Sequence, residues 1–198
     1  FPGIDDALHG NDVRCFVWHL HTNGSLARNG GNDSNAERTE TQGDVVFEIT
    51  DFAQKIHPNA ELEPVARHGE KPQILQFGSA VEELSGIMGL ISTYRKSGYK
   101  SLGIICKTEQ QARKMADMLK SYANDISFLS SQSSAFVQGI VITSAHMAKG
   151  LEFDEVIIPQ TDERNYRSEI DKSMLYVAVT RAMHRLTLTF HEARPATH

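Results

Sequence analysis

The pattern of hydrophobic positions changes near residue 46. Between Asn23 and Gly43 the chain has one leucine, no aromatic residue and many turn-forming residues. This stretch buries too little apolar surface to offset the entropy lost on ordering. We therefore expect residues 1–46 to be irregular and flexible. From Val45 onward, apolar residues recur as they do in a packed α/β domain, which predicts a single domain over residues 47–198.

Within that domain, short apolar runs alternate with helical periodicities. Strands are predicted at Ile74–Phe77, Leu102–Cys106, Ile126–Leu129, Gly139–Thr143, Glu155–Pro159 and Leu186–Phe190. Helices are predicted at Ser79–Ser97, at Glu109–Ala123 after an N-cap at Thr108, and at Ser168–Ala182, with a further helix beginning near Glu48. The inward face of the helix at Ser79–Ser97 is expected to include Val81, Leu84, Met88, Ile91 and Tyr94. The inward face of the helix at Glu109–Ala123 is expected to include Ala112, Met115, Ala116, Leu119 and Tyr122. Such alternation implies an α/β fold with a mainly parallel sheet flanked by helices.

Composition narrows the classes of function. The chain has 198 residues, and its formal net charge of −5 argues against a protein that coats nucleic acid by bulk charge, although a local phosphate site is compatible with it. It has no apolar run of membrane-spanning length and no secretion signal, so no membrane partner is expected. Only two cysteines are present, which favours a reducing, cytoplasmic location. His19 and His21 lack acidic or cysteine partners at ligand spacing, so we predict no metal site.

Two strings of residues carry candidate chemistry. The first, ITSAHMAKGLEFDEVIIP over Ile142–Pro159, has short hydroxyls at a strand end, which suit a phosphate backbone. It also has a glycine at 150 that permits close approach or a positive φ, and Glu152, which could accept a ribose hydroxyl. The second, MLYVAVTRAMHRLTLTF over Met174–Phe190, sets Arg181 at the end of an apolar helix, where it could be aimed at a phosphate. On residue types alone, a solvated loop and a surface arginine are the alternative.

Together the two strings resemble motifs V and VI of the UvrD/Rep-type superfamily I helicases, in which AKGLEFD and YVAxTRA recur in this order. The resemblance covers about Glu48 to Phe190 and implies the second RecA-like motor domain, a P-loop NTPase-like fold without its P-loop half. It implies contacts with single-stranded DNA for Thr143, Ser144, His146 and Lys149. It implies ATP contacts for Gly150, for Glu152 at the sugar and for Arg181 at the γ-phosphate, with Tyr176 and Thr180 in support. Arg181 would then be the catalytic arginine.

The chain departs from the family pattern in three ways. It has no GxxxxGK[ST] loop and no acidic pair at a strand end for magnesium. By the resemblance, the first motor domain of the same protein would therefore bind most of the ATP and Mg²⁺, and this chain alone should be inactive and hold neither tightly. Only 15 residues separate Ala123 from Gly139, which resembles the short HelD-like branch. Gly43–Phe47 stands where relatives have Tyr-Arg-Ser, so either this lineage lost the motif or residues 1–46 are not the native upstream sequence.

Three functions are compatible with these residues. The first is an ATP-driven helicase or translocase on single-stranded DNA, and the second is a HelD-like, ATP-driven remodeller of RNA polymerase. The third is a non-catalytic binding remnant. Two structural expectations accompany them: Arg181 is exposed, so its replacement by alanine leaves folding nearly unchanged, and His184 and Arg185 cap the end of the last helix.

Overall fold

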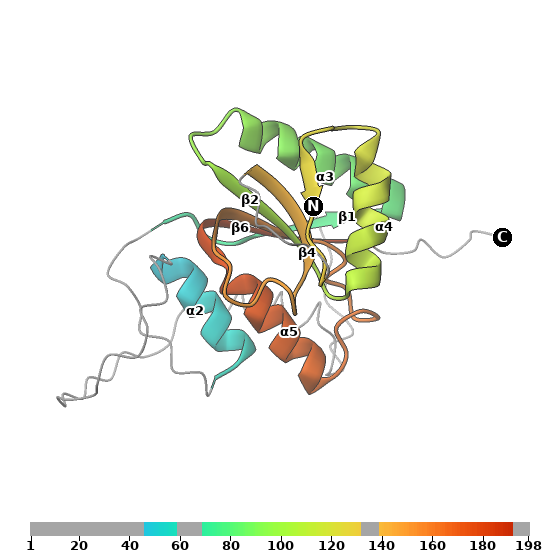
Figure 1. Ribbon diagram of the computed structural model, residues 1–198. Helices are drawn as coiled ribbons and strands as arrows, with labels where there is room; N and C mark the ends of the chain where they lie inside the picture. The colour runs from blue at the N-terminus through green and yellow to red at the C-terminus, as the bar shows by residue number, and fades with distance from the viewer. Residues whose placement is uncertain (1–45, 59–68, 132–138, 192–198) are drawn as a thin grey trace, which may run out of the picture.

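The computed structural model describes residues 46–58, 69–131 and 139–191. Over these ranges six strands form one sheet in the order β1-β6-β5-β2-β4-β3, and each neighbouring pair is parallel (Figure 1). The strands are β1 (Gln73–Phe77), β2 (Ser101–Cys106), β3 (Ile126–Phe128), β4 (Gly139–Ser144), β5 (Phe153–Ile158) and β6 (Ala182–His191). The predicted flexible segment falls on residues that, except for Val46, lie outside the described ranges.

Four helices in the described ranges cover the two faces of the sheet. They are α2 (Phe47–Ile56), α3 (Ala80–Arg95), α4 (Glu109–Lys120) and α5 (Glu169–Val179). In Figure 1, α2 and α5 lie together on one side of the sheet, and α3 and α4 lie on the other. Each pair closes its own apolar cluster against the strands, the first around Phe153 and Leu186 and the second around Ile104 and Ile142. The predicted parallel α/β architecture is therefore confirmed.

The sequence explains why these elements form where they do. β2 and β4 are continuous apolar runs, as expected for strands covered on both faces, and all but their first residues are buried. Thr108 caps α4 as predicted, since its side chain accepts from the Gln111 amide and the Gln111 side chain reciprocates. Ser168 and Asp171 form the same capping box at the start of α5. Two helices therefore begin at positions that the sequence marks.

Two residues predicted to face inward do not. Val81 is 74% exposed, because the buried face of α3 is made by Glu83, Ile87, Ile91 and Tyr94. Glu83 can occupy that face because its carboxylate accepts from the Gln160 amide at 2.8 Å and from the Thr189 hydroxyl at 2.7 Å. Tyr122 follows the end of α4 and is 39% exposed, with its hydroxyl 2.7 Å from that of Ser92.

The boundaries of α5 and β6 also differ from prediction. β6 starts at Ala182, and two residues lie between it and the end of α5, so His184 and Arg185 belong to the strand and do not cap α5. The His184 ring stacks on Tyr99 with centroids 5.5 Å apart. Val46, the first described residue, is 2% exposed, and its amide donates to the Met183 carbonyl at 3.2 Å. The packed domain therefore includes this residue. In the described part of the chain, no helix has the length and apolar character needed to cross a bilayer.

Candidate nucleotide and nucleic-acid site

Residues 145–152, which we call the crossover, connect the carboxyl end of β4 to the amino end of β5. These two ends lie at opposite ends of the parallel strands. Ser144 pairs with Cys106 at the carboxyl end of β2, whereas Glu155 pairs with Leu102 near the amino end of the same strand. The chain must therefore run back along the height of the sheet between β4 and β5. Ala145 and Ala148 face the core and are 1% and 0% exposed. The crossover thus follows the predicted DNA-contacting residues Thr143 and Ser144 at the end of β4. It itself carries the other two, His146 and Lys149, together with the predicted nucleotide-contacting residues Gly150 and Glu152.

The four predicted DNA-contacting residues divide into two kinds. Thr143 is fully buried, and its hydroxyl donates to the Leu129 carbonyl at 3.0 Å. Ser144 is 3% exposed, and its hydroxyl accepts from the Met147 amide at 3.4 Å. His146 and Lys149, by contrast, are exposed on the crossover. In this conformation the two hydroxyls hold the start of the crossover, and only the histidine and the lysine are accessible to a ligand.

Arg181 is buried, which corrects the expectation of an exposed side chain. Only 8% of the residue is accessible. Its guanidinium donates three hydrogen bonds: Nε to the Val177 carbonyl at 3.2 Å, Nη1 to the Leu151 carbonyl at 3.3 Å and Nη2 to the Thr180 hydroxyl at 3.2 Å. The turn from α5 into β6 places the side chain back against its own helix end and against the crossover, which explains the burial.

All three acceptors of Arg181 are neutral. In the described ranges, no carboxylate forms an ion pair with this guanidinium. Burial lowers the pKa of the Arg181 guanidinium, and the nearby charge of Glu152 opposes that effect. A buried cation whose hydrogen-bond acceptors are neutral carbonyl and hydroxyl groups is a favourable partner for an anion, because charge-assisted hydrogen bonds are stronger than neutral ones.

The predicted nucleotide-contacting residues come together around this arginine. Gly150 adopts φ +84°, a conformation that favours glycine, and it is exposed near the carboxyl end of the crossover. Glu152 is exposed and electrostatically coupled to Arg181. Tyr176 lies one turn before the arginine, where burial raises the pKa of its phenol, and its ring meets that of His57 at 5.6 Å. The cluster can offer a guanidinium, a carboxylate and an accessible main chain to a phosphorylated ligand.

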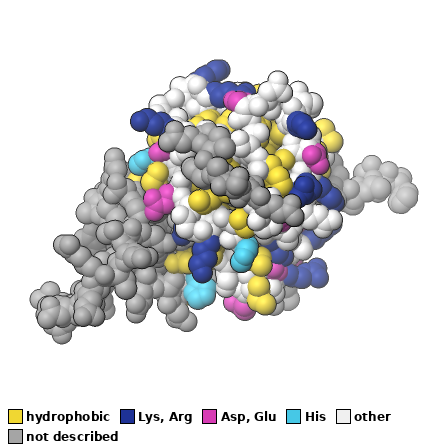
Figure 2. Space-filling view, viewed as in Figure 1, with side chains coloured by type: hydrophobic (Ala, Val, Ile, Leu, Met, Phe, Trp, Pro, Cys, Tyr) yellow, Lys and Arg dark blue, Asp and Glu magenta, His cyan; other side chains and the backbone are white. Residues whose placement is uncertain are grey.

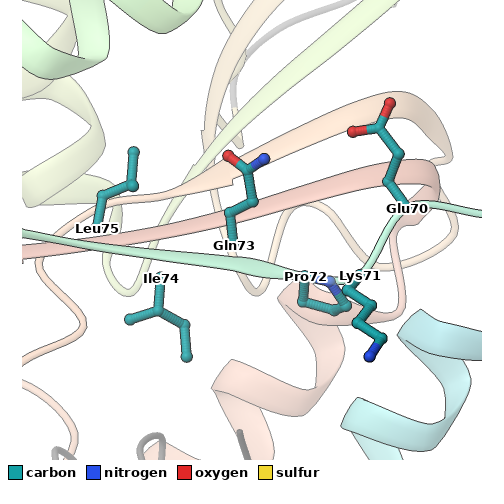
Figure 3. A pocket seen from close by; sticks show the side chains of 6 residues that line it. All are labelled: Glu70, Lys71, Pro72, Gln73, Ile74 and Leu75. Atoms are coloured by element: carbon teal, nitrogen blue, oxygen red, sulfur yellow. The ribbon is translucent and has the colours of Figure 1, made fainter.

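Other parts of the described surface offer less. Within the described ranges, no group of three or more His, Cys, Asp or Glu side chains could hold a metal ion. A shallow hollow of about 480 Å³ lies along β1 and contains none of the predicted site residues. Figure 3 shows that it follows one strand edge, with Ile74 and Leu75 on opposite sides of the strand. In Figure 2, Lys and Arg side chains are interspersed with Asp and Glu over the visible face, so any phosphate binding there is local.

Sequence reasoning missed the groups that orient this site. Two of the three acceptors of Arg181 are main-chain carbonyls, which residue types do not reveal. It also missed the pair of Lys107 and Asp171, whose Nζ and Oδ1 atoms are 2.5 Å apart and which joins the end of β2 to the start of α5. The Ser168-x-x-Asp171 capping pattern marks the helix start and could have drawn attention to this carboxylate.

Comparisons with known proteins agree with the fold and the motifs. Residues 123–193 match the family described as UvrD-like helicase C-terminal domain. A segment of 73 residues is 34% identical to DNA helicase II of Escherichia coli (strain K12) and, to the same extent, of Salmonella typhimurium (strain LT2). Each match covers 32% of this chain and 10% of the relative, so the chain spans about a tenth of the length of these relatives.

One solved structure matches over most of the domain. It is the C-terminal domain of a possible DNA helicase from Lactobacillus plantarum WCFS1, with a TM-score of 0.64 and 24% identity over 77% of this chain and 89% of that one. At this identity the likeness establishes the fold, which is the RecA-like α/β fold of helicase C-terminal domains. Over residues 123–193 the chain is thus similar to UvrD-like helicase C-terminal domains, and the fold of the described residues agrees with that similarity.

Proposed function

We propose that this domain is the second motor domain of an ATP-dependent DNA helicase or translocase and that it contributes Arg181 to phosphoryl transfer. The observation that carries the proposal is the burial of the Arg181 guanidinium, which forms no ion pair within the described ranges, donates to the Leu151 carbonyl and lies near the charge of Glu152. The name of the relatives, DNA helicase II, supports the same activity for the whole protein.

In this proposal the domain supplies only part of the ATP site. Arg181 contacts the γ-phosphate and stabilises the charge that develops on it during transfer. Glu152 accepts from a ribose hydroxyl, and the exposed main chain at Gly150 approaches the phosphates. Thr180 positions the arginine through its hydroxyl, and Tyr176 packs beside it. The Mg²⁺ that accompanies the nucleotide is held by the first motor domain and by the phosphates.

The proposed contacts with single-stranded DNA lie on the crossover. His146 and Lys149 are exposed and reach phosphate oxygens directly, whereas Thr143 and Ser144 keep the crossover in place through their buried hydroxyls. Because the whole chain is acidic, binding depends on these few groups and weakens steeply with salt. RNA polymerase stays the alternative partner, under the HelD-like remodelling function.

Phosphate release is the test of the nucleotide role. The 198-residue chain should release none from ATP, with or without oligodeoxythymidine, because it lacks the phosphate-binding loop. The protein that joins this domain to a phosphate-binding motor domain should turn over ATP faster with the oligonucleotide. Turnover by the chain alone would show that the ATP site is misassigned. Stimulation by RNA polymerase and not by the oligonucleotide would favour the remodelling function.

The strand contact has a separate test. Lys149→Ala should weaken oligodeoxythymidine binding and reduce the slope of log affinity against log salt by about 0.7, the value for one phosphate contact on a single strand. Lys114→Ala is the matched control, because Lys114 is also exposed but lies on α4, on the other face of the sheet. Equal effects of the two variants would contradict a specific role for the crossover.

A further inference from the structure

The three acceptors of Arg181 come from two different parts of the chain. The Val177 carbonyl and the Thr180 hydroxyl belong to the end of α5, and so they move with the arginine. The Leu151 carbonyl belongs to the crossover, 30 residues away in sequence, and accepts from Nη1 at 3.3 Å. This contact is therefore the direct link between the guanidinium and the segment that carries the proposed strand contacts.

Main-chain hydrogen bonds connect Leu151 to those contacts. The Leu151 amide donates to the Ala148 carbonyl at 3.0 Å, and the Lys149 amide donates to the His146 carbonyl at 3.4 Å. Gly150, with φ +84°, stands between Lys149 and Leu151 and sets the direction of the peptide that follows. A ligand that shifts His146 and Lys149 therefore shifts the turn on which the Leu151 carbonyl depends.

The Arg181 side chain can also leave its inward position for an outward one at little cost in free energy. Burial disfavours the charge of Arg181, since its three acceptors are neutral and only the nearby Glu152 opposes this effect. The hydrogen bonds of 3.2 to 3.3 Å lie at or slightly beyond the long end of the normal range. In an outward position the guanidinium would lose three neutral acceptors and gain contacts with solvent or with an anion. A ligand that favours the outward position by a modest free energy is therefore enough to shift the equilibrium between the two positions.

We propose that Arg181 has an inward resting position held by the Leu151 carbonyl, and that binding of single-stranded DNA to the crossover releases it toward the nucleotide. The proposal rests on the proposed function, since it concerns how that same site is regulated. It assigns the crossover a coupling role: the strand acts on the arginine through the main chain between residues 146 and 151. Leu151 is thus a positioning residue, and the group that acts is its carbonyl.

Two glycine substitutions test the resting position in the chain itself. Gly150→Ala adds a methyl group that meets no atom within 4 Å, so it acts only by straining the positive φ and moving the adjacent Leu151 peptide. Gly139→Ala is the matched control, because Gly139 has φ +104° and equally empty surroundings but lies at the start of β4. The readout is the rate at which phenylglyoxal modifies Arg181, followed by peptide mass spectrometry and normalised to the exposed Arg164.

Arg181 should react slowly in the wild-type chain, and Gly150→Ala should raise its rate by about fivefold or more, the scale expected for backbone strain of this kind. Gly139→Ala should leave the normalised rate unchanged. Equal rates in the two variants, or a fast reaction in the wild type, would overturn the inward position. Circular dichroism at the same temperature establishes that both variants are folded during the reaction.

Oligodeoxythymidine tests the trigger. Its addition to the wild-type chain should accelerate modification of Arg181, and the double variant H146A/K149A should abolish that acceleration. If fluorescence anisotropy shows binding while the rate stays constant, the coupling is wrong and the proposed strand contact stands. If the oligonucleotide does not bind, both the strand contact and the trigger fail, whereas the comparison of Gly150→Ala with Gly139→Ala still decides the resting position.

Discussion

Glu155 and Glu70 both bind the guanidinium of Arg185, but Glu155 is buried and Glu70 is exposed to solvent. Glu155 is 1% exposed and accepts from Nη1 at 3.3 Å. The Glu70 side chain is 48% exposed and accepts two hydrogen bonds, at 3.0 and 2.7 Å. Burial raises the pKa of Glu155, whereas the hydrogen bonds from Arg185 lower the pKa of Glu70. The two carboxylates should therefore affect the pH dependence of stability with opposite signs.

We predict that Glu155→Gln stabilises the domain at neutral pH. The ordinary pKa of Glu155 is 4.5, and in the folded state its pKa is raised. The stability that such a group contributes is present below the ordinary pKa and is lost as pH rises through the raised one. At pH 7 the charge of Glu155 is thus a cost, and glutamine removes it while keeping an acceptor for Arg185. The free energy of unfolding in urea should rise by about 1 kcal/mol at pH 7, and the gain should disappear below about pH 4.

Glu70→Gln is the matched control and should act in the opposite direction. Its lowered pKa means that the carboxylate stabilises the fold above pH 4.5 and loses this effect as pH falls through the folded value. Solvent screens this exposed pair, so the loss at pH 7 should be only a few tenths of a kcal/mol. A loss of stability in Glu155→Gln at pH 7 would show that its bond to Arg185 outweighs the cost of burial.

A close approach between two strands gives a second prediction. A Cβ added to Gly103 in β2 would lie 2.7 Å from the ring of Phe153 in β5, which is fully buried. Gly103→Ala should therefore lower the free energy of unfolding by about 1–3 kcal/mol through overpacking. Gly98→Ala should change it by less than about 0.5 kcal/mol, because nothing lies within 4 Å of that position. Phe153→Leu should relieve the clash, so the double variant should be more stable than the sum of the single effects predicts.

The sequence predicted the elements well where one local signal decides them. Buried parallel strands such as Leu102–Cys106 are uninterrupted apolar runs, and the caps at Thr108 and Ser168 are set by neighbours three residues away. It did not predict the inward face of α3. The partners that make Glu83 a core residue, Gln160 and Thr189, lie 77 and 106 residues further along the chain. The periodicity of apolar residues carries no information about such distant partners, and so it places Val81 in the core instead of Glu83.

For the candidate site, the sequence predicted which side chains belong together but not whether each is buried or exposed. The resemblance of the two strings to motifs V and VI brought Gly150, Glu152 and Arg181 into one set. In the structure Arg181 contacts the carbonyl of Leu151, which follows Gly150, and it feels the nearby charge of Glu152. Their roles toward a nucleotide stay a prediction. The burial of Arg181 could not be inferred, because it depends on the Val177 and Leu151 carbonyls, which the fold brings to the guanidinium from the end of α5 and from the crossover. Main-chain acceptors carry no residue-specific signal.

The ion pair of Lys107 and Asp171 gives a third prediction. Burial alone would raise the pKa of Asp171, but hydrogen bonds from Lys107 and from the Ser168 and Arg167 amides hold it below its usual range. Lys107→Met leaves this carboxylate partly buried without its cation, so the free energy of unfolding should fall by about 1–3 kcal/mol at pH 7.

The pH dependence and a surface lysine are the controls for this pair. The stability that Asp171 contributes is present above its ordinary pKa of 3.8 and is lost as pH falls through the lowered value. The difference between wild type and Lys107→Met should therefore be constant from pH 8 to 5 and shrink in acid. Lys172→Met, which removes a cation from the exposed Glu169, should cost less than about 0.5 kcal/mol. Equal losses in the two variants would mean that the buried pair is no stronger than a surface pair.

The last prediction separates the stability contributed by Arg181 from its role in turnover. Arg181→Met replaces a buried cation, which has only neutral hydrogen-bond acceptors among the described residues, by an apolar side chain of similar length, and replacing buried charge by apolar groups is often neutral or stabilising. The melting temperature of the chain should therefore stay the same or rise, whereas Arg181→Ala should cost about 2 kcal/mol through the cavity it leaves. In the protein with both motor domains, Arg181→Met should reduce DNA-stimulated turnover by about 10³–10⁵-fold. Arg181→Lys should restore little, because lysine lacks the planar fork. Wild-type turnover in the methionine variant would refute the catalytic assignment, and a strongly lowered melting temperature would show that the three neutral hydrogen bonds outweigh the cost of burying the charge.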